Sequence, residues 1–372
     1  MFRTPTRIVE SDRLAAIDAM RGLVVFAWLL SELGVPALYE IASTPVTDAI
    51  IAELSPSFWH GSTIRDLILP AFCFIAGVSI VPAFKKRREM GKSNRDLAFR
   101  IVRRVICLFV IGLVCEGGLF DHWPSLRFVG AFQRIAICYA FAAFLELSTG
   151  RRIQAGLVAF LLLNYWLILD IGTGADSMSP FSQNGNIVAT VDRVILPGRK
   201  YFATWDPDGL LTTVPAIAVT ICGLLAGRLL TDQSRSRGNA SLWLIGTGMA
   251  ALNLSFLWGT VLPINSHLWT SSFCLLAIGA MLILLGGLHA VIEGPVVKAW
   301  IAPPAALGRN SLVVILSALL FRRIAEVLAG CLPLLSRLSP EGPSDPVCAS
   351  LIAIAVIVTA SLLDRRRSYL TV

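Results

Sequence analysis

Long apolar segments follow one another along almost the whole chain, separated by short polar segments. A helix needs about 20 predominantly apolar residues to cross the hydrocarbon core of a bilayer. The pattern predicts ten crossings, at residues 15–35, 66–84, 101–119, 128–148, 153–172, 209–230, 241–261, 268–288, 310–330 and 347–363. The sequence therefore predicts an all-α fold, a polytopic transmembrane helical bundle that forms a single domain over residues 1–372.

The composition favours the same class of protein. Hydrophobic residues make up 55% of the chain and charged residues only 15%, whereas a soluble protein has about 25% charged residues. The mean hydropathy is +0.72. We therefore expect an integral membrane protein surrounded by membrane lipid. The net charge of +8 does not require a nucleic acid as partner, because basic loops explain it.

Basic residues fall in alternate loops of the predicted bundle. The most basic segment is 85–104, and the segments 150–152, 227–238 and 364–367 have the same sign. Loops rich in Lys and Arg remain on the cytoplasmic side of a membrane. With ten helices, these loops and both termini lie on one side, so we predict that both termini are cytoplasmic. The loops 36–65, 120–127, 173–208, 262–267 and 331–346 are then on the outer side.

The eight cysteines do not have the spacing of a metal site or a redox pair. Most lie inside apolar segments, and no Cys-x-x-Cys pair occurs, so we expect neither a metal nor a reactive thiol centre. Cys331 and Cys348 flank one outer loop, where an oxidising compartment would permit a disulfide. The alternative for each is a buried cysteine that packs as a small apolar side chain.

Polar side chains gather at the predicted outer ends of several helices. The stretch WHGSTIRD places Trp59, His60 and Asp66 at the mouth of the second crossing. The other members of this outer set are Glu116, Arg127, Gln133, Arg134, Asp206, Asp208, Asn265, His267 and Trp269. Ionisable groups this close to hydrocarbon are costly and usually face an internal cavity. Each residue alone also has a structural interpretation, as an interfacial aromatic, a helix cap or an ion pair such as Arg134 with Asp66.

A smaller polar set lies near the predicted cytoplasmic ends. Asp18 and Arg21 stand three residues apart in the first crossing, close enough for an intrahelical pair. Arg309 and Asn310 follow two prolines and a glycine in APPAALGRNSL, where we expect a break and a re-entrant or interfacial segment. A polar path between the two faces suits a carrier, and equally an enzyme whose donor and acceptor come from opposite sides.

Six short motifs occur in a characteristic order: RLAAIDAMRGL, WHGSTIRDLILPAFCFIAGVS, VGAFQRIAICY, DPDGLLTTVPAI, LPINSHLWTSS and LGRNSL. In this order and at these spacings they resemble the heparan-α-glucosaminide N-acetyltransferase family and its bacterial relatives, over nearly the whole chain. The resemblance implies a membrane acetyltransferase of ten or eleven helices, placed in a bacterial inner (cytoplasmic) membrane. Such an enzyme moves acetyl from cytosolic acetyl-CoA, its donor substrate, to an amino sugar or glycan on the outer face, and needs no metal.

The resemblance also suggests which residues act. The family's catalytic histidine stands three residues before the tryptophan of the W-x-G motif, and that position is Pro56 in this chain. The nearest imidazole is His60, which we predict to be the base, with Asp66 and Arg134 as catalytic partners. An imidazole suits this task because its unperturbed pKa of about 6.5 lets it take and give a proton near neutrality.

The remaining candidates are binding residues. For the acceptor they are Trp59, Arg127, Gln133, Asp208, Asn265, His267 and Trp269, and for acetyl-CoA they are Asp18, Arg21, Arg309 and Asn310. Lys85–Arg88 would also attract nucleotide phosphates, although membrane topology alone explains these basic residues. Two alternatives stay open: a sugar-type transporter that uses the same polar path, and a catalytically inactive relative with Pro56 at the histidine position. A homodimer is compatible with the sequence.

Overall fold

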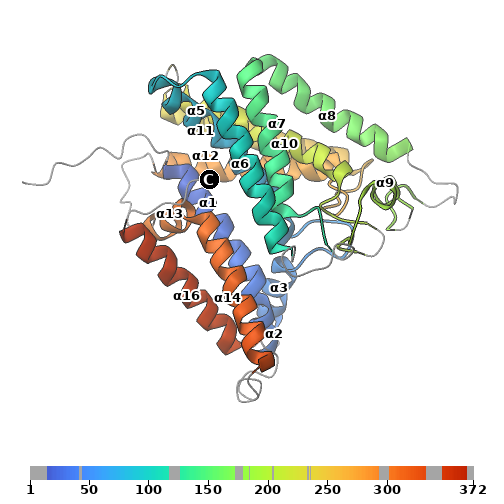
Figure 1. Ribbon diagram of the computed structural model, residues 1–372. Coiled ribbons are helices and arrows are strands. Elements are labelled where there is room, and N and C mark those ends of the chain that lie inside the picture. The colour runs from blue at the N-terminus through green and yellow to red at the C-terminus, as the bar shows by residue number, and fades with distance from the viewer. Residues whose placement is uncertain are drawn as a thin grey trace, which may run out of the picture.

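The computed structural model describes residues 15–41, 44–116, 126–171, 179–183, 185–202, 205–232, 234, 236–292, 301–331 and 346–366. Its helices are, in chain order, α1 (Ala15–Leu29), α2 (Val35–Ile41), α3 (Pro45–Leu54), α4 (Ile68–Val78), α5 (Ile80–Glu89), α6 (Asn94–Cys115), α7 (Ala131–Ser148), α8 (Arg151–Ile171), α9 (Ile187–Ile195), α10 (Leu210–Thr231), α11 (Arg237–Gly259), α12 (Ser271–Ile292), α13 (Ala302–Arg309), α14 (Ser311–Cys331) and α16 (Pro346–Arg365). A π-helical turn (Leu30–Gly34) joins α1 to α2, and a 3-10 turn (Arg65–Leu67) precedes α4. Figure 1 shows how these helices are arranged.

A helix occupies each of the ten predicted crossings, so the all-helical class is confirmed. In the described part of the chain, seven helices are long and apolar enough to span a membrane: Ala15–Leu38, Arg65–Glu89, Ala131–Ser148, Arg151–Ile171, Leu210–Thr231, Gly238–Gly259 and Ser271–Ile292. The pair α13–α14 makes up to eight if it counts as one broken span. The full count of ten, the cytoplasmic termini and the single domain remain predictions.

Two glycine contacts bring α4 and α10 together at the centre of the bundle. A Cβ on Gly77 would lie 2.0 Å from the carbonyl oxygen of Thr220, and a Cβ on Gly223 would lie 2.0 Å from that of Phe74. Helices in membranes associate chiefly through close packing, and small residues let their backbones approach. This contact fixes α4, which follows the WHG stretch, against α10, which follows the Asp206–Gly209 turn.

The helix α13 lies against α1 in the same way. A Cβ on Gly22 would overlap the carbonyl oxygen of Pro304, at 1.7 Å, and a Cβ on Gly308 would overlap that of Asp18, at 1.8 Å. The break expected in APPAALGRNSL is present, but the two prolines do not cause it, because they lie in the first turn of α13, where a missing N–H costs nothing. The chain bends instead between Arg309 and Ser311, by 83°.

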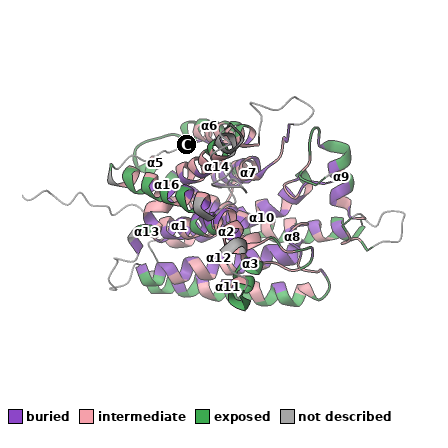
Figure 2. Cartoon of the chain, turned by 90° about the horizontal axis from the view of Figure 1, so that it is seen from below, coloured by how far each residue is buried: buried purple, intermediate pink, exposed green. Residues whose placement is uncertain are grey.

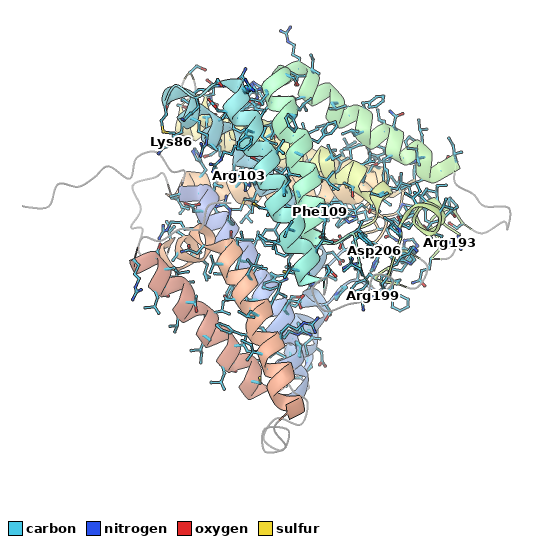
Figure 3. All side chains as sticks on the ribbon, in the orientation of Figure 1. Lys86, Arg103, Phe109, Arg193, Arg199 and Asp206 are labelled. Atoms are coloured by element: carbon cyan, nitrogen blue, oxygen red, sulfur yellow. The ribbon has the colours of Figure 1, made fainter. Side chains whose placement is uncertain are left out.

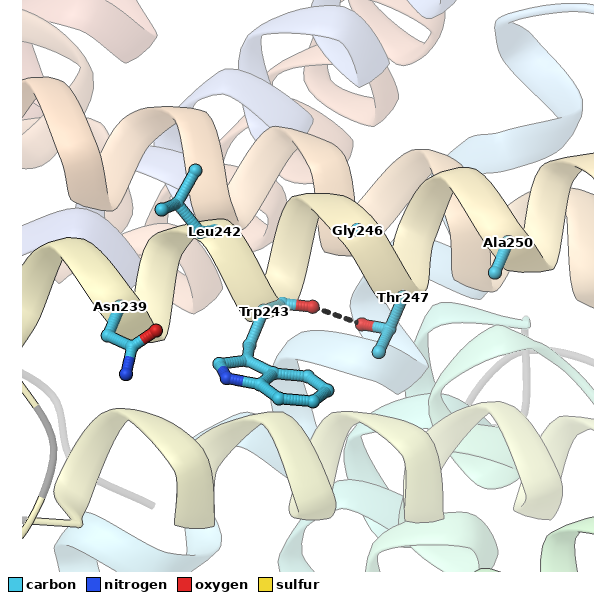
Figure 4. A pocket seen from close by; sticks show the side chains of 6 residues that line it. All are labelled: Asn239, Leu242, Trp243, Gly246, Thr247 and Ala250. Atoms are coloured by element: carbon cyan, nitrogen blue, oxygen red, sulfur yellow. Dashed lines mark hydrogen bonds between the residues drawn. The ribbon is translucent and has the colours of Figure 1, made fainter.

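The outer helices present apolar side chains to their surroundings. In Figure 1, α14 and α16 pack together beside α1, on the side of the molecule away from α8. Figure 2 shows α11 at one margin of the bundle with an exposed outer face, which carries Leu242, Trp243, Phe256 and Leu257. A shallow pocket of about 330 Å³ lies along this helix (Figure 4), and none of its lining side chains is ionisable. These faces fit contact with lipid rather than with water.

Candidate functional site

The basic segment 85–104 and the loop 173–208 have residues at opposite ends of the molecule. In Figure 3, Lys86 and Arg103 of the basic segment lie at one end, and Asp206, Arg193 and Arg199 lie at the other. This separation agrees with the predicted sidedness of the loops. We call the second end the outer end.

Two loops pack against each other at the outer end. The backbone N–H of Gly61 donates to the carbonyl oxygen of Ile264 at 2.8 Å, and the hydroxyl oxygens of Ser57 and Ser266 lie 3.0 Å apart. Gly61 has a φ of +99°, which a residue with a side chain rarely adopts. The glycine of the WHG motif therefore lets the two loops pair.

An aromatic cluster holds the same two loops. The ring of Trp59 stacks on that of His267, with 5.4 Å between centroids and 13° between planes. The ring of Trp205 lies edge-on to Trp59, at 5.6 Å, and the indole N–H of Trp59 donates to the carbonyl oxygen of Phe181 at 2.8 Å. Trp59 is buried, so it is a packing element of the site and not an exposed interfacial residue.

A pocket of about 600 Å³ opens beside this cluster. It is lined by Asp48, Ile51, Ala52, Ser55, Pro56, Ser57, Phe58, His60, Gly61, Ser62 and Thr63. His60 is the imidazole in this lining, and Pro56, at the family's histidine position, lies in the same pocket. A histidine at either position would thus face the same space.

The two histidines differ in their hydrogen bonds. The Nε2–H of His267 donates to the carbonyl oxygen of Ser57 at 2.8 Å, since a carbonyl only accepts. The side-chain nitrogens of His60 and Asn265 lie 3.4 Å apart. Asn265 is fully buried, and its Oδ1 accepts from the N–H of Leu268 at 2.9 Å, which leaves its NH2 group to face His60.

Asp66 shapes the WHG loop. Its Oδ2 accepts the backbone N–H groups of Ser57, at 3.2 Å, and of Thr63, at 3.1 Å. Its neighbour Arg65 donates to Glu32 at 2.7 Å. The suggested ion pair of Arg134 with Asp66 is wrong, because a different carboxylate, described below, lies beside Arg134. The structure thus makes Asp66 a residue that positions the backbone around the pocket.

Arg127 is the centre of a buried charge network. Its guanidinium contacts Asp206 through two nitrogens, at 2.8 and 2.7 Å, Asp208 at 3.0 Å and Glu116 at 3.0 Å. Arg127 is 6% exposed and Asp206 is fully buried. Burial lowers the pKa of Arg127, but the three carboxylates outweigh burial and hold it above its usual value. Since α7 begins at Ala131, Arg127 lies in the segment before that helix and does not share a helical face with Arg134.

Arg134 contacts the same turn from the helix itself. It donates to the carbonyl oxygen of Pro207 at 2.7 Å and to the hydroxyl of Thr212, and it lies 3.6 Å from Asp208. The guanidinium carbon lies 4.6 Å from the ring centre of Trp269. Because Arg134 is only 1% exposed, its charge is held in place by carbonyls, a carboxylate and an aromatic face. Neighbouring Gln133 is equally buried, and both its amide atoms lack partners among the described residues.

Asp192 belongs to this network and was missed from sequence. It lies on the short helix α9, and its Oδ2 accepts the backbone N–H of Asp206 at 3.0 Å. Burial raises its pKa to about 6, partly offset by that hydrogen bond. The signal in the sequence was its spacing: Val188 and Asp192 stand four apart, so the carboxylate shares the apolar face of the helix.

The inner polar set comes together in part. Arg21 donates to Asp18 at 3.2 Å, as predicted, and to the hydroxyl of Ser79 at 2.8 Å. Arg309 instead forms two 2.8 Å contacts with Asp364 on α16. Asn310 is 2% exposed, and neither atom of its amide has a hydrogen-bond partner among the described residues. The side chain of Cys331 lies outside the described residues, so its pairing with Cys348 stays a prediction.

The described residues contain no group of three or more His, Cys, Asp or Glu side chains that could hold a metal. The outer end instead offers imidazoles, buried arginines and carboxylates, on loops that follow or precede membrane helices. The fold and this site define an integral membrane protein with a polar pocket at one end of the bundle.

Sequence comparison identifies its relatives. No family model matches the chain. The chain is 23% identical to the heparan-alpha-glucosaminide N-acetyltransferase of Mus musculus over 431 aligned positions, which cover 99% of this chain and 62% of the relative. It is 24% identical to the enzyme of that name from Homo sapiens, over 69% of this chain and 47% of the relative. The resemblance that the motifs indicate is therefore confirmed, while the chain spans 62% and 47% of the lengths of these relatives.

Proposed function

We propose that the protein is a membrane acetyltransferase that moves acetyl from cytosolic acetyl-CoA to the amino group of an amino sugar or glycan at the outer end. The observation that carries the proposal is the similarity to enzymes named N-acetyltransferases over 99% of the chain. The pocket that holds His60 supports it, because the reaction needs a base at a site large enough for a sugar.

The chemistry assigned to the pocket is aminolysis of a thioester. The amino nitrogen attacks the carbonyl carbon, the new C–N bond forms, and the C–S bond breaks with release of the CoA thiolate. The base removes the proton of the attacking nitrogen and returns a proton to the sulfur. Hydrogen-bond donors stabilise the negative oxygen that develops during attack. An acyl-imidazole on the same histidine is the two-step form of this reaction.

His60 is the base in this proposal because it lines the pocket. The NH2 group of Asn265, held by Leu268, lies 3.4 Å from Nδ1 of His60, so Nδ1 is the acceptor nitrogen and has to leave this long contact when it takes the proton. His267 is the second candidate: its Nε2 is committed to the carbonyl of Ser57, which leaves Nδ1 as the nitrogen that accepts a proton. Asp66 contributes by holding the loop, and Arg127 and Arg134 by fixing the turn that precedes α10.

The donor enters from the other end in this proposal, toward Asp18, Arg21 and Asn310. The buried amide of Asn310 supports it, since an unsatisfied buried polar group costs about 1–3 kcal/mol and neither of its amide atoms has a partner in the described chain. The pantetheine arm of CoA carries amides that would supply both partners. Asn310→Leu should therefore weaken acetyl-CoA binding in calorimetry while leaving the protein folded.

The test is transfer of labelled acetyl from acetyl-CoA to glucosamine by the purified protein in nanodiscs. His60→Ala should lower kcat by ~10²-fold or more, the usual scale of general acid–base catalysis, with acetyl-CoA affinity unchanged. His267→Ala should lower it less. Pro56→His is the converse variant: a large gain in rate would mean that His60 has not taken over the family histidine's role. Absence of acetyl-CoA binding at millimolar concentration would remove the enzyme from consideration and leave the transporter and the inactive relative.

A further inference from the structure

The pocket with His60 has an exposed apolar border. Phe58, in the pocket lining, is 93% exposed. Val46 and Ile50 of the neighbouring helix α3 are 69% and 43% exposed, and Ile64 is 50% exposed. Val46 and Ile50 stand four residues apart, so they share one face of α3, while Ile51 on another face is buried and lines the pocket. The helix thus buries Ile51 and exposes Val46 and Ile50.

The position of α3 explains what its outward face meets. It lies between two consecutive candidate spans, Ala15–Leu38 and Arg65–Glu89, and its 10 residues are too few to cross a bilayer. A short helix with exposed apolar residues, next to the ends of membrane helices, lies in the membrane interface. Thr44 caps its first turn through Thr47, and Ser31 donates to the carbonyl of Leu54 at 2.8 Å. The C-terminal end of the helix is therefore tied to the turn that follows α1.

The pocket and its border together have the shape of a site for an amphiphile. One part of the lining is polar: Asp48, Ser55, Ser57, His60, Ser62 and Thr63. The other part is apolar and includes Phe58, whose side chain is exposed at the border of the pocket, while Val46 and Ile50 are exposed on the opposite side of helix α3. A free sugar would use only the polar part, because it has no hydrocarbon to place on Phe58, Val46 or Ile50.

We propose that the acceptor is a lipid-linked amino sugar. Its glycan head enters the pocket beside His60, and its hydrocarbon chain passes Phe58 and curves around α3 to reach Val46 and Ile50, in the outer leaflet. This inference rests on the proposed function and specifies its substrate class. Each methylene that leaves water contributes about 0.8 kcal/mol, so even a short alkyl chain gives a measurable gain in affinity.

The experiment compares two acceptors that differ only in their alkyl group, methyl β-glucosaminide and octyl β-glucosaminide, with the protein in nanodiscs. The expected KM is at least ~10-fold lower for the octyl compound, with similar kcat. Val46→Ser and Ile50→Ser should reduce the ratio of the two KM values several-fold. Leu257→Ser on α11 is the matched control, because Leu257 is 70% exposed, much as Val46 is, and lies on a different part of the surface.

Each outcome decides one question. Equal KM values for the two acceptors would overturn the lipid-linked acceptor and leave the acetyltransferase standing. The octyl compound could also have the lower KM without any specific effect of α3. If Leu257→Ser reduced the ratio of the two KM values as much as Val46→Ser, or if neither α3 variant changed it, the preference would reflect simple partition into the bilayer and the inference would be overturned. Transfer to neither compound, with acetyl-CoA bound, would instead contradict the proposed function. A ratio reduced by the α3 variants alone supports the inference.

Discussion

Replacement of Arg127 by methionine removes the cation at the centre of the outer charge network. Methionine keeps much of the apolar stem and its packing, so the change isolates the guanidinium. Asp206 is fully buried and would lose both of its contacts with Arg127, at 2.7 and 2.8 Å. Asp208 and Glu116 would each lose one.

The expected cost follows from burial. Removal of one partner from a buried ion pair costs about 3–5 kcal/mol, because the remaining charge stays buried without compensation. Arg309 provides the comparison: it also forms two 2.8 Å contacts with one carboxylate, but its side chain and that of Asp364 are each 24% exposed. A fully exposed pair contributes about 1 kcal/mol or less, and this partly exposed pair should cost less to break than the buried one because solvent reaches the carboxylate that is left. Arg127→Met should therefore destabilise the protein several times more than Arg309→Met.

The assay is unfolding in detergent, followed by tryptophan fluorescence at a fixed scan rate, with a double-mutant cycle between Arg127→Met and Asp206→Asn. The second change neutralises the buried carboxylate, so the double variant should be more stable than the sum of the single effects predicts, by roughly 1–3 kcal/mol. The reasoning is refuted if Arg127→Met and Arg309→Met cost the same, or if the two changes at the network add independently.

Two further predictions concern pH dependence and topology. Asp192 has a pKa of about 6 in the folded protein against 3.8 for the free side chain, so the folded state holds its proton more tightly. The free energy of unfolding therefore falls as pH rises from about 4 to 6, by ~2–3 kcal/mol, and Asp192→Asn should lose this dependence. The same pH dependence of melting in both proteins across that range would contradict the assignment. Reporter fusions after Arg104 should report the cytoplasm and fusions near Gly185 the outer side, whereas a cytoplasmic signal at Gly185 would overturn the predicted orientation.

The sequence by itself determined the class of the protein and the rough positions of its helices. Each membrane helix is specified by its own apolar residues, because the bilayer requires every crossing to satisfy its backbone internally. Local pairs are predictable for the same reason: Asp18 and Arg21 meet because they stand three residues apart on one helix. The six ordered motifs likewise identified relatives that the comparison confirmed.

The tertiary structure alone decided which polar residues meet. His267 donates to a backbone carbonyl that lies 210 residues away in the chain, and Arg127 contacts a carboxylate 79 residues away. Sequence placed these side chains at one level of the membrane, but the partner of each depends on how helices pack and where loops turn. In the packed structure Asp66 accepts backbone N–H groups of its own loop, and the carboxylate beside Arg134 is that of Asp208. Asp192 joins the charge network from a helix outside the predicted crossings. Contacts between distant segments are set by the close approach of helices such as α4 and α10, which no single segment encodes.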